Sequence, residues 1–538
     1  MPLTVFATET EELKERIALN ALADELLEHC VKDRLSLKAS MDRFLPAISA
    51  RLGAKGGVLL TRDERLHQAS FSSGELGAED AWTLLSGRAD GAHEVKGQVL
   101  VCRTLDVAGQ AVGQLGFLFD ALGCPGELAC ERLGFVAEEL DAILSTVHTA
   151  SEKQRLIEHL NRALANRVFE KGLDDAVAVL HQCVGFLKLL FVWRDPVAAD
   201  ALYYRFYREG KLEYFSEGGP HPGLEAAIRE QGLELLSPER HRLRDVLGVD
   251  GAQESVLVSG LTRADWLGKV LVQPGETGFS TFALDLVRLL AEMARERLVD
   301  HNRERRHLAQ YFPARVINEL LREPAYQERY LTPRDEKVAI LYADINSFTK
   351  LSEQVLEEPG AIGRFVDEWS AGAVDILWKH GGTFDKMVGD CVIGLFGPPF
   401  FTDPEPSRAL AALHAAREIL DFTVRFGEKA GLNARIAKVP ELPDGLGVAI
   451  GVNLCPACVG LFGPNQDYTA FSSGMNSTAR LQALAGFREM LAMESVLEAV
   501  RGLPDAQGFA FGEIREAQVK NVRKPLRFAR ILPEEKQA

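Results

Sequence analysis

The sequence predicts a mixed α/β (α+β) protein with two similar αβ units in tandem, followed by a larger αβ domain. Its 538 residues suggest three or four domains at roughly 150 residues per domain. Short apolar stretches typical of strands alternate with longer stretches of helical periodicity, and this alternation occurs twice before residue 300. Beyond residue 336, apolar strands end in acidic residues, which indicates a domain of another kind.

Composition excludes several classes of protein. Apolar residues make up 46% of the chain, enough for several cores, so it is not disordered. With 61 basic and 77 acidic residues the net charge is −16, which opposes nucleic acid and anionic membranes as partners. Eight scattered cysteines without a signal peptide predict reduced thiols and a cytoplasmic location.

The longest uncharged stretch covers residues 445–466 and is long enough to cross a membrane. Asn453, Pro456 and five glycines oppose that interpretation. We expect two buried strands joined by a turn here, and no transmembrane segment anywhere.

The first 34 residues predict a charged helix, and residues 35–150 a first αβ unit with its closing helix. Within this unit Gly56–Thr61 is typical of a strand. Val99–Val107 and Ala111–Asp120 flank a short polar turn at 108–110, which predicts a hairpin.

The closing helix shows two apolar series with a period of seven residues. The first contains Leu133, Leu140 and Val147 and continues with polar Gln154 and Asn161; the second contains Val136, Ile143, Ala150, Ile157 and Leu164. These are the a and d positions of a coiled coil, which favours a seam between two copies of the chain. The alternative is an amphipathic helix that packs on its own domain.

Residues 151–300 predict a connecting helix and a second αβ unit. Its expected strands are Leu202–Phe206 and Leu212–Phe215 around a turn at Glu209–Lys211, then Ser255–Ser259 and Leu267–Gln273, before a helix at Phe282–Leu298. Residues 301–335 predict a helical linker that transmits signals, with a new helix at Ala314–Leu321 after Pro313. A plain surface linker is the alternative.

Both αβ units resemble the GAF family of sensor domains. The segments AVGQLGFLF and DWLGKVLVQ resemble the penultimate GAF strand, and a long closing helix follows each. The sequence lacks the Asn-Lys…Phe…Asp-Glu signature of cyclic-nucleotide-binding GAF domains and the Cys-His pair of bilin-attaching ones. The resemblance implies an unknown small-molecule ligand, although one or both units can also bind nothing.

The region 336–538 carries three informative segments. The apolar strand Val338–Tyr342 leads to Asp344 just before a helix, which is a usual place for a metal or phosphate site, or for a plain helix cap. Asp390 follows Gly389 in a hairpin turn, where an aspartate is often only a turn residue. Two carboxylates placed together, however, suit Mg²⁺ or Mn²⁺ with substrate phosphates as further ligands.

The third segment is Asp467–Leu481. Asn476 and Arg480 are four residues apart, which puts them on one face of a helix. An amide beside a fixed cation suits a sugar and a charged phosphorus centre. An ordinary polar helix face is the alternative.

Together YADINSFT, GGTFDKMVGD and MNSTARL resemble the class III nucleotidyl cyclase catalytic domain. The resemblance implies a ferredoxin-like fold, a head-to-tail homodimer, and conversion of a nucleoside triphosphate to its 3′,5′-cyclic monophosphate and pyrophosphate. It assigns the following roles: Asp344 and Asp390 hold two metal ions with help from the Ile345 carbonyl, Lys386 contacts the purine, Asn476 orients the ribose, Arg480 stabilises charge at the α-phosphate, and Lys520 holds the distal phosphates.

Chain geometry also favours a dimer. Lys386 and Asp390 are four residues apart on a strand and its turn, and an extended chain separates them by up to about 13 Å. One ATP can hardly reach both in the same chain unless it folds back. If each serves a different site of a symmetric homodimer, the difficulty disappears.

Lys386 and Thr469 bear on the choice of base. A lysine donor favours the acceptor N1 of adenine, whereas resembling guanylyl cyclases place glutamate there. The lysine–threonine pair resembles the subgroup that includes the bicarbonate-responsive soluble cyclases. We therefore expect ATP as substrate and hold bicarbonate stimulation as a hypothesis, which a cyclic AMP output that stays flat across added bicarbonate at fixed pH would refute. A guanylate cyclase and a catalytically silent, ligand-sensing homologue are the alternatives.

Cys455 and Cys458 form a lone Cys-x-x-Cys motif. Such a motif can be redox-active or half of a zinc site. No second pair follows at metal spacing, so we expect buried structural thiols, with redox control as the minor hypothesis.

Overall fold

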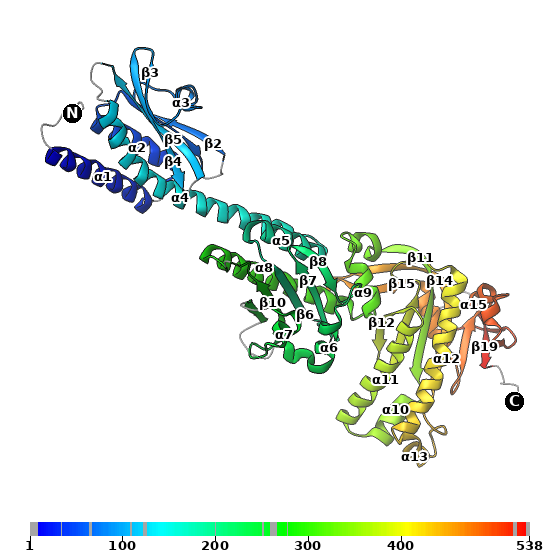
Figure 1. Cartoon of the computed structure of the whole chain (residues 1–538). Coiled ribbons are helices and arrows are strands. Elements are labelled where there is room, and N and C mark those ends of the chain that lie inside the picture. The colour runs from blue at the N-terminus through cyan, green and yellow to red at the C-terminus, as the bar shows by residue number, and fades with distance from the viewer. Residues whose placement is uncertain are drawn as a thin grey trace. The chain divides into compact units, whose positions relative to one another are not determined.

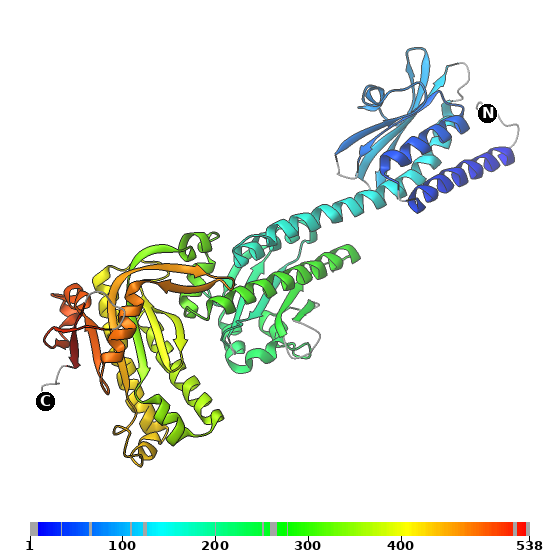
Figure 2. The same cartoon turned by 180° about the vertical axis from the view of Figure 1, so that it is seen from behind.

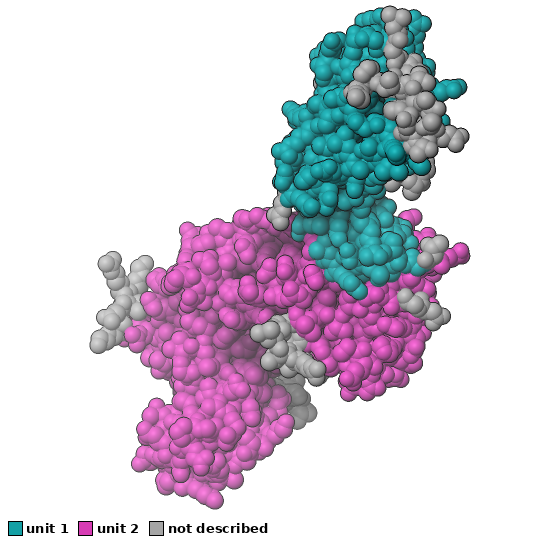
Figure 3. All heavy atoms as spheres, turned by 90° about the vertical axis from the view of Figure 1, so that its left-hand side faces the viewer, with its two compact units in different colours: residues 1–163, 176–185, 278–290 teal, residues 164–175, 186–277, 291–538 magenta. Residues whose placement is uncertain are grey.

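The computed structural model describes residues 9–33, 35–63, 67–107, 110–121, 126–198, 201–249, 252–258, 266–276, 278–519 and 525–533. The chain divides into two compact units (Figure 3): residues 1–163, 176–185 and 278–290 form the first, and residues 164–175, 186–277 and 291–538 form the second. Among the described residues we find no helix whose length and apolar content would let it span a bilayer.

The first αβ domain is built on a five-stranded antiparallel sheet of order β2-β1-β5-β4-β3. Its elements are α1 (Glu9–Lys32), α2 (Leu37–Leu52), β1 (Gly56–Arg62), β2 (Gln68–Ser72), α3 (Ala78–Leu85), β3 (Gly91–Val95), β4 (Gln98–Val107), β5 (Gln110–Asp120) and α4 (Gly126–Leu164). The predicted strand at Gly56–Thr61 and the predicted hairpin strands are confirmed. Residues 108–109 of the expected turn lie outside the described residues.

Helices α1 and α4 both contribute to the core of this domain. Leu19 and Leu27 of α1 lie in one buried cluster with Phe44 and with Leu133 and Leu140 of α4. The predicted N-terminal helix is therefore packed on the first domain.

The heptad series of α4 is used for the same packing. Leu133, Val136 and Leu140 are at most 1% exposed within their own domain. Reading these first positions as a seam between two copies was therefore wrong, because α2 and the sheet already cover them. Further along α4, Ala150 is exposed, and a seam there stays a prediction.

The second αβ domain has an antiparallel sheet of order β8-β7-β6-β10-β9. Its elements are α5 (Phe169–Val184), β6 (Lys188–Arg194), β7 (Leu202–Arg208), β8 (Lys211–Phe215), α6 (Pro222–Gln231), α7 (Arg242–Leu247), β9 (Gln253–Val258), β10 (Trp266–Gln273) and α8 (Thr281–Leu308). The predicted strands are confirmed, apart from Ser259, which lies outside the described residues. Glu209 and Gly210 both have positive φ, +47° and +73°, as a tight hairpin turn requires.

The predicted linker 301–335 is helical in large part. Helix α8 continues through the polar stretch to Leu308, and α9 (Ala314–Leu321) begins directly after Pro313. The predicted helix at Ala314–Leu321 is thus confirmed, with Pro313 at its N-cap, and the transmission of signals by the linker stays a prediction.

The C-terminal part of the second unit is built on a sheet of order β12-β13-β11-β14-β16-β19-β17, with β15 paired to β14 and β18 to β19. Its elements are β11 (Arg334–Ile345), α10 (Phe348–Leu351), α11 (Pro359–Lys379), β12 (Gly382–Val388), β13 (Cys391–Phe396), α12 (Glu405–Lys429), α13 (Leu432–Ile436), β14 (Val448–Phe462), β15 (Asp467–Phe471), α14 (Ser473–Leu484), β16 (Met490–Met493), α15 (Glu494–Val500), β17 (Phe509–Phe511), β18 (Arg515–Ala517) and β19 (Leu526–Pro533).

The first four strands and two long helices of this sheet run in the order βαββαβ. Their spatial order β12-β13-β11-β14 is that of a ferredoxin-like split βαβ. Helices α11 and α12 lie side by side over one face (Figure 1), while α14, orange in Figure 2, lies on the other.

Within the uncharged stretch 445–466, Val448–Phe462 form one long strand, β14, where we expected two strands and a turn. The prediction of a turn was wrong because the polar Asn453 and the proline Pro456 are both accommodated within the strand. The Asn453 side chain donates to the Gly474 carbonyl (3.3 Å) and accepts from the Ser495 hydroxyl (3.3 Å). Pro456 pairs with Lys337 without interrupting the ladder with β11.

Within the second αβ domain, a buried ion pair joins the end of β6 to the last turn of α8. Arg305 donates through Nη2 to Asp195 Oδ2 at 3.0 Å and through Nη1 to Asn318 Oδ1 at 2.6 Å. Asp195 is 1% and Arg305 4% exposed. Asp195 also accepts the Val197 N–H at 2.8 Å, which fixes its carboxylate.

We predict that breaking this pair destabilises the second unit strongly. Asp195→Asn retains the acceptor for Val197 but leaves the Arg305 charge buried without its counter-ion, which costs about 3 kcal/mol. Arg305→Met should cost a similar amount, and the double variant clearly less than the sum. The measurement is the midpoint of thermal unfolding of the full chain. Arg303→Met, in an exposed pair with Asp300, is the matched control and should shift the midpoint little; additive effects of the two buried substitutions would contradict the prediction.

Candidate active site

Asp344 lies at the end of the central strand β11. Along this strand Ala339, Leu341 and Ala343 point into the core beneath α11 and α12, while Val338 and Ile340 point to the opposite face. The alternation puts Asp344 on that opposite face, near α14. Gln482 Nε2 of α14 donates to Asp344 Oδ2 at 3.4 Å.

Asp390 lies in the tight turn that joins β12 to β13. Gly389 before it has φ +64°, a conformation that glycine adopts without strain. The turn reaches the end of β11, where the backbone N–H of Ile345 donates to Asp390 Oδ2 at 3.2 Å. The structure thus brings Asp344 and Asp390 to one edge of the sheet, as the sequence predicts.

The surroundings of Asp344 and Asp390 raise the pKa of both carboxyl groups, and a bound cation would favour their ionised form. Burial, and then the neighbouring charge of Asp344, raises the pKa of Asp390 to about 6. Burial also raises the pKa of Asp344, against the hydrogen bond from Gln482. A site that disfavours two ionised carboxylates without a cation is the usual electrostatic environment of a metal-binding pair.

Asn476 and Arg480 lie on the exposed side of α14, whose opposite side buries Met475, Thr478 and Leu481. The helix is capped by Ser472, whose hydroxyl accepts the Gly474 N–H at 2.7 Å. Within the described part of the chain, no ion pair or side-chain hydrogen bond ties up either residue. Their predicted placement on one helix face is confirmed, and both remain available to a ligand.

Lys386 and Thr469 share a pocket of about 670 Å³. This volume is in the usual range of small-molecule sites. Tyr311, Phe384, Met387, Phe462 and Phe471 form much of its wall. The Lys386 ammonium lies 5.9 Å from the centre of the Phe471 ring, so the pocket offers aromatic surface beside a cation.

Asp385 is a residue of this pocket that our sequence reasoning missed. It is 4% exposed, and its Oδ1 accepts the Thr469 hydroxyl at 2.6 Å. The sequence does show two adjacent charged residues, Asp385 and Lys386, on a predicted strand. Strict alternation along a strand would point only one of these two side chains inward. A β-bulge between Phe384 and Lys386, invisible in the sequence, decides which one.

Two assigned roles have no structural test. Lys520 lies outside the described residues, so its contact with distal phosphates stays a prediction. For Ile345 the structure gives the N–H bond to Asp390, whereas the metal-directed carbonyl stays a prediction.

Cys455 and Cys458 both lie on the continuous strand β14 and are half-buried. Residues three apart on a strand point to opposite faces, so these thiols cannot join in a disulfide or a common metal site. Cys455 packs on the start of α14, with its Sγ 3.8 Å from the Ser472 hydroxyl. Burial raises its pKa, which keeps the thiol protonated and unreactive.

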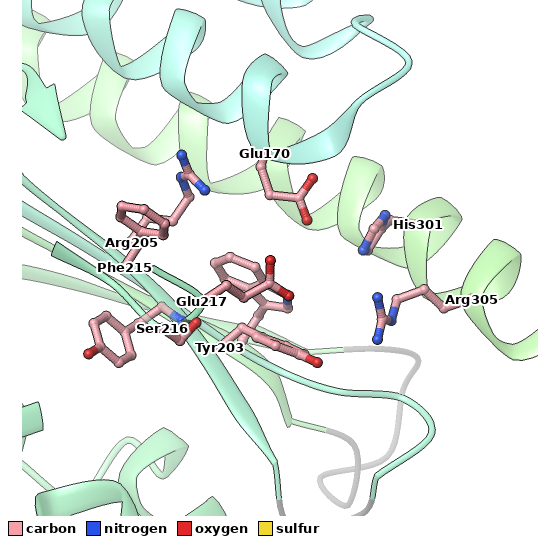
Figure 4. A pocket seen from close by; sticks show the side chains of 10 residues that line it. Glu170, Tyr203, Arg205, Phe215, Ser216, Glu217, His301 and Arg305 are labelled. Carbon is pink, nitrogen blue, oxygen red and sulfur yellow. Dashed lines mark hydrogen bonds between the residues drawn. The ribbon is translucent and has the colours of Figure 1, made fainter. Parts of the chain in front are cut away.

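A second pocket lies in the second αβ domain (Figure 4). Glu170 of α5 and His301 and Arg305 of α8 point from their helices toward Tyr203 and Glu217 on the sheet side. Burial, and then the Arg305 charge, lowers the pKa of His301 to about 3, so it is neutral. The cavity measures about 20 Å³, which holds roughly one water molecule.

Comparisons with known proteins agree with the geometry of the catalytic part. Residues 331–529 match the adenylate and guanylate cyclase catalytic domain family. An uncharacterized protein of Mycobacterium tuberculosis is 30% identical over 193 residues, covering 35% of this chain and 32% of that protein. The adenylate cyclase of Anabaena cylindrica is 26% identical over 148 residues, covering 28% and 27%. The chain thus spans about a third of the length of the curated relatives it matches.

Solved structures similar to this chain include the adenylyl cyclase CyaB from P. aeruginosa, at 24% identity and TM-score 0.34 over 39% of this chain and 100% of that one. The guanylate cyclase domain of RhGC from Catenaria anguillulae in complex with GTP is similar at 16% identity and TM-score 0.30, over 38% and 100%.

Residues 331–529 are therefore a class III adenylate and guanylate cyclase catalytic domain. This part of the sequence-based prediction is confirmed. The GAF resemblance of the two preceding domains stays a prediction.

We predict that Asp390→Asn stabilises the metal-free protein. The folded carboxyl has a pKa of about 6 and an unfolded aspartate one near 4, so the folded state binds more protons between these values. Stability contributed by this group therefore falls as pH rises from about 4 to 6. Asparagine retains an acceptor for the Ile345 N–H and removes the charge, so the variant should melt higher than wild type at pH 7.

The same variant should lose the increase in melting temperature that Mn²⁺ gives the wild type. Asp367→Asn, at an exposed position of α11, is the control and should keep that increase. An unchanged Mn²⁺ response in Asp390→Asn would exclude Asp390 as a metal ligand.

Proposed function

We propose that this protein is an adenylate cyclase that converts ATP to 3′,5′-cyclic AMP and pyrophosphate in a head-to-tail homodimer. The meeting of Asp344 and Asp390 at one sheet edge carries the proposal. The cyclase family of residues 331–529 limits the reaction class, and the adenylate cyclase of Anabaena cylindrica is one of the relatives.

Two divalent cations, Mg²⁺ or Mn²⁺, suit this pair of carboxylates. Among the described residues no group of three or more His, Cys, Asp or Glu could hold a metal without help. Oxygens of the triphosphate would therefore complete the ligand set, as is usual for Mg²⁺. When bound, such cations lower the pKa of the attacking 3′-hydroxyl and stabilise the leaving pyrophosphate.

The protein side chains orient the nucleotide around that centre. Lys386 donates to the adenine ring, and Thr469 accepts from its amine. Asn476 holds the ribose, so that the 3′-oxygen faces the α-phosphorus in line. Arg480 then meets the charge that develops on the α-phosphate, as a preorganised cation. Lys520 is the proposed contact for the distal phosphates.

The separation of the two groups supports the homodimer. Asp344 and Asp390 are not among the described residues that line the pocket of Lys386 and Thr469. A complete site would therefore combine the base pocket of one subunit with the carboxylates of its partner, twice per symmetric dimer.

Two alternatives are less well supported. A guanylate cyclase would have to place the donor Lys386 against the N1–H of guanine, another donor. A catalytically silent homologue would not need the whole set of Asp344, Lys386, Asp390, Asn476 and Arg480, which this chain retains.

Regulation through the N-terminal domains is part of the proposal. Tyr311, just beyond α8, lines the base pocket, and its hydroxyl donates to Asp467 at 3.2 Å. Arg305 of α8 is held by Asp195 of the second αβ domain. A ligand that changed this domain would thus act on α8 and, through it, on the pocket wall. The ligand is an unknown small molecule, and bicarbonate stimulation stays a prediction.

We predict that the purified full chain with Mn²⁺ forms cyclic AMP from ATP at least tenfold faster than cyclic GMP from GTP, because the Lys386–Thr469 pair matches adenine. Asp344→Asn should lower the rate by more than about a hundredfold. Asp367→Asn is again the surface control. Product formation in Asp344→Asn at the wild-type rate would sink the metal assignment.

The dimer arrangement predicts rescue between two inactive variants. Lys386→Ala and Asp390→Asn chains mixed and reassembled in equal amounts form half heterodimers, each with one intact composite site. The mixture should reach about a quarter of wild-type activity. If each site belonged to a single chain, mixing would restore nothing.

A further inference from the structure

Asp385 has no role in the mechanism above, yet it is a buried carboxyl group in the lining of the base pocket. Pairing of β12 with β13 shifts register between Phe384 and Lys386, so Asp385 is the extra residue of a β-bulge. The bulge turns Asp385 inward, to 4% exposure, and leaves the side chain of Lys386 44% exposed in the pocket. A carboxyl group this deep is costly unless its oxygens find partners.

The contacts of Asp385 decide where the hydroxyl proton of Thr469 lies. Asp385 Oδ1 is 2.6 Å from the Thr469 hydroxyl and 3.3 Å from the backbone N–H of Ala470. An N–H can only donate, so Oδ1 is an acceptor, and the proton in the shorter contact belongs to Thr469. A threonine hydroxyl has one proton and two lone pairs. Toward the rest of the pocket, Thr469 is therefore an acceptor only.

The second carboxyl oxygen acts on Lys386. Asp385 Oδ2 is buried, has no hydrogen-bond partner among the described residues, and lies 3.7 Å from Lys386 Nζ. Its charge attracts the ammonium group, which has only donors, while Thr469 is bonded to the other oxygen of the same carboxyl group. The pocket thus presents a donor and an acceptor side by side.

We propose that Asp385 is a positioning residue that sets the base selectivity of this pocket by fixing the direction of the Thr469 hydroxyl; the inference rests on the proposed function. Adenine carries the acceptor N1 beside its donor amine and so matches Lys386 and Thr469. Guanine carries a donor at N1 and the acceptor O6 and mismatches both. A freely rotating hydroxyl accepts or donates and serves either base. Held by Asp385, Thr469 can serve only adenine.

A purely structural role makes a different prediction. Asp385 also ties β12 to β15 through Ala470, and loss of that tie would impair both nucleotides equally. Selectivity through Thr469 changes the ratio of the two kcat/KM values, for ATP and for GTP. The ratio therefore separates the two roles.

The experiment measures kcat/KM for ATP and GTP with Mn²⁺ in the full chain. Asp385→Val removes the acceptor and should lower the ATP-to-GTP ratio about tenfold, the effect of losing one directed hydrogen bond in a buried site. Asp385→Asn is the matched control: its oxygen still accepts from Ala470 and Thr469, so the ratio should stay within about threefold of wild type. Thr469→Val should match Asp385→Val, and the double variant should lose no more than either alone.

Binding of 3′-deoxy-ATP and 3′-deoxy-GTP, which lack the attacking hydroxyl, should show the same change in ratio by calorimetry. An unchanged ratio in Asp385→Val, or an equal loss in Asp385→Asn, would overturn the inference. If thermal melting shows that Asp385→Val does not fold, Thr469→Val decides, and an unchanged ratio there also overturns it. A wild type that forms no cyclic product, or prefers GTP, contradicts the proposed function; the deoxynucleotide binding ratio then still tests Asp385.

Discussion

The register of β11 between β13 and β14 is the constraint on which the candidate active site depends. Ala343 pairs with Val392 of β13, and Ile345 pairs with Val448 of β14, so the end of β11 is level with the β12–β13 turn. This alignment brings the Ile345 N–H within hydrogen-bond distance of Asp390. A slip by one residue would turn Asp344 into the core beneath α11 and α12. The apolar residues of β11, buried on both faces, oppose such a slip.

Burial of three carboxyl groups in the cyclase domain is electrostatically unfavourable, because it disfavours their ionised form. Burial raises the pKa values of Asp344, Asp385 and Asp390. Asp385 finds its partners within the protein, in Thr469, Ala470 and Lys386. Asp344 and Asp390 lie on different chain segments, and the charge of Asp344 adds to the raised pKa of Asp390. A bound cation would offset this repulsion. Strain of this kind is typical of functional sites.

The segment after α8 connects that helix to the pocket of Lys386 through ordinary packing. Tyr311 and Phe312 pack against the buried ring of Tyr468, and the Tyr311 carbonyl accepts from the Trp378 indole (3.1 Å) and the Phe384 N–H (3.1 Å). A displacement of α8 would therefore move Tyr311 in the wall of the Lys386 pocket. On the other side, Arg305 is fixed by Asp195 and Asn318. Contacts within the protein thus fix both the last turn of α8, at Arg305, and the segment just after it, at Tyr311.

Local sequence patterns determined much of this protein by themselves. The strands and hairpins follow from apolar runs between turn residues. Three motifs were enough to place Asp344, Asp390, Asn476 and Arg480 on their elements, because each depends on a spacing within one segment. Tertiary structure alone decided what depends on a partner in space. It assigned the first heptads of α4 to the domain's own core, kept β14 continuous through Asn453 and Pro456, and separated Cys455 from Cys458 on opposite faces. It also placed Asp385 under Thr469 by a bulge, since a shift of pairing between two strands leaves no trace in either strand's own sequence.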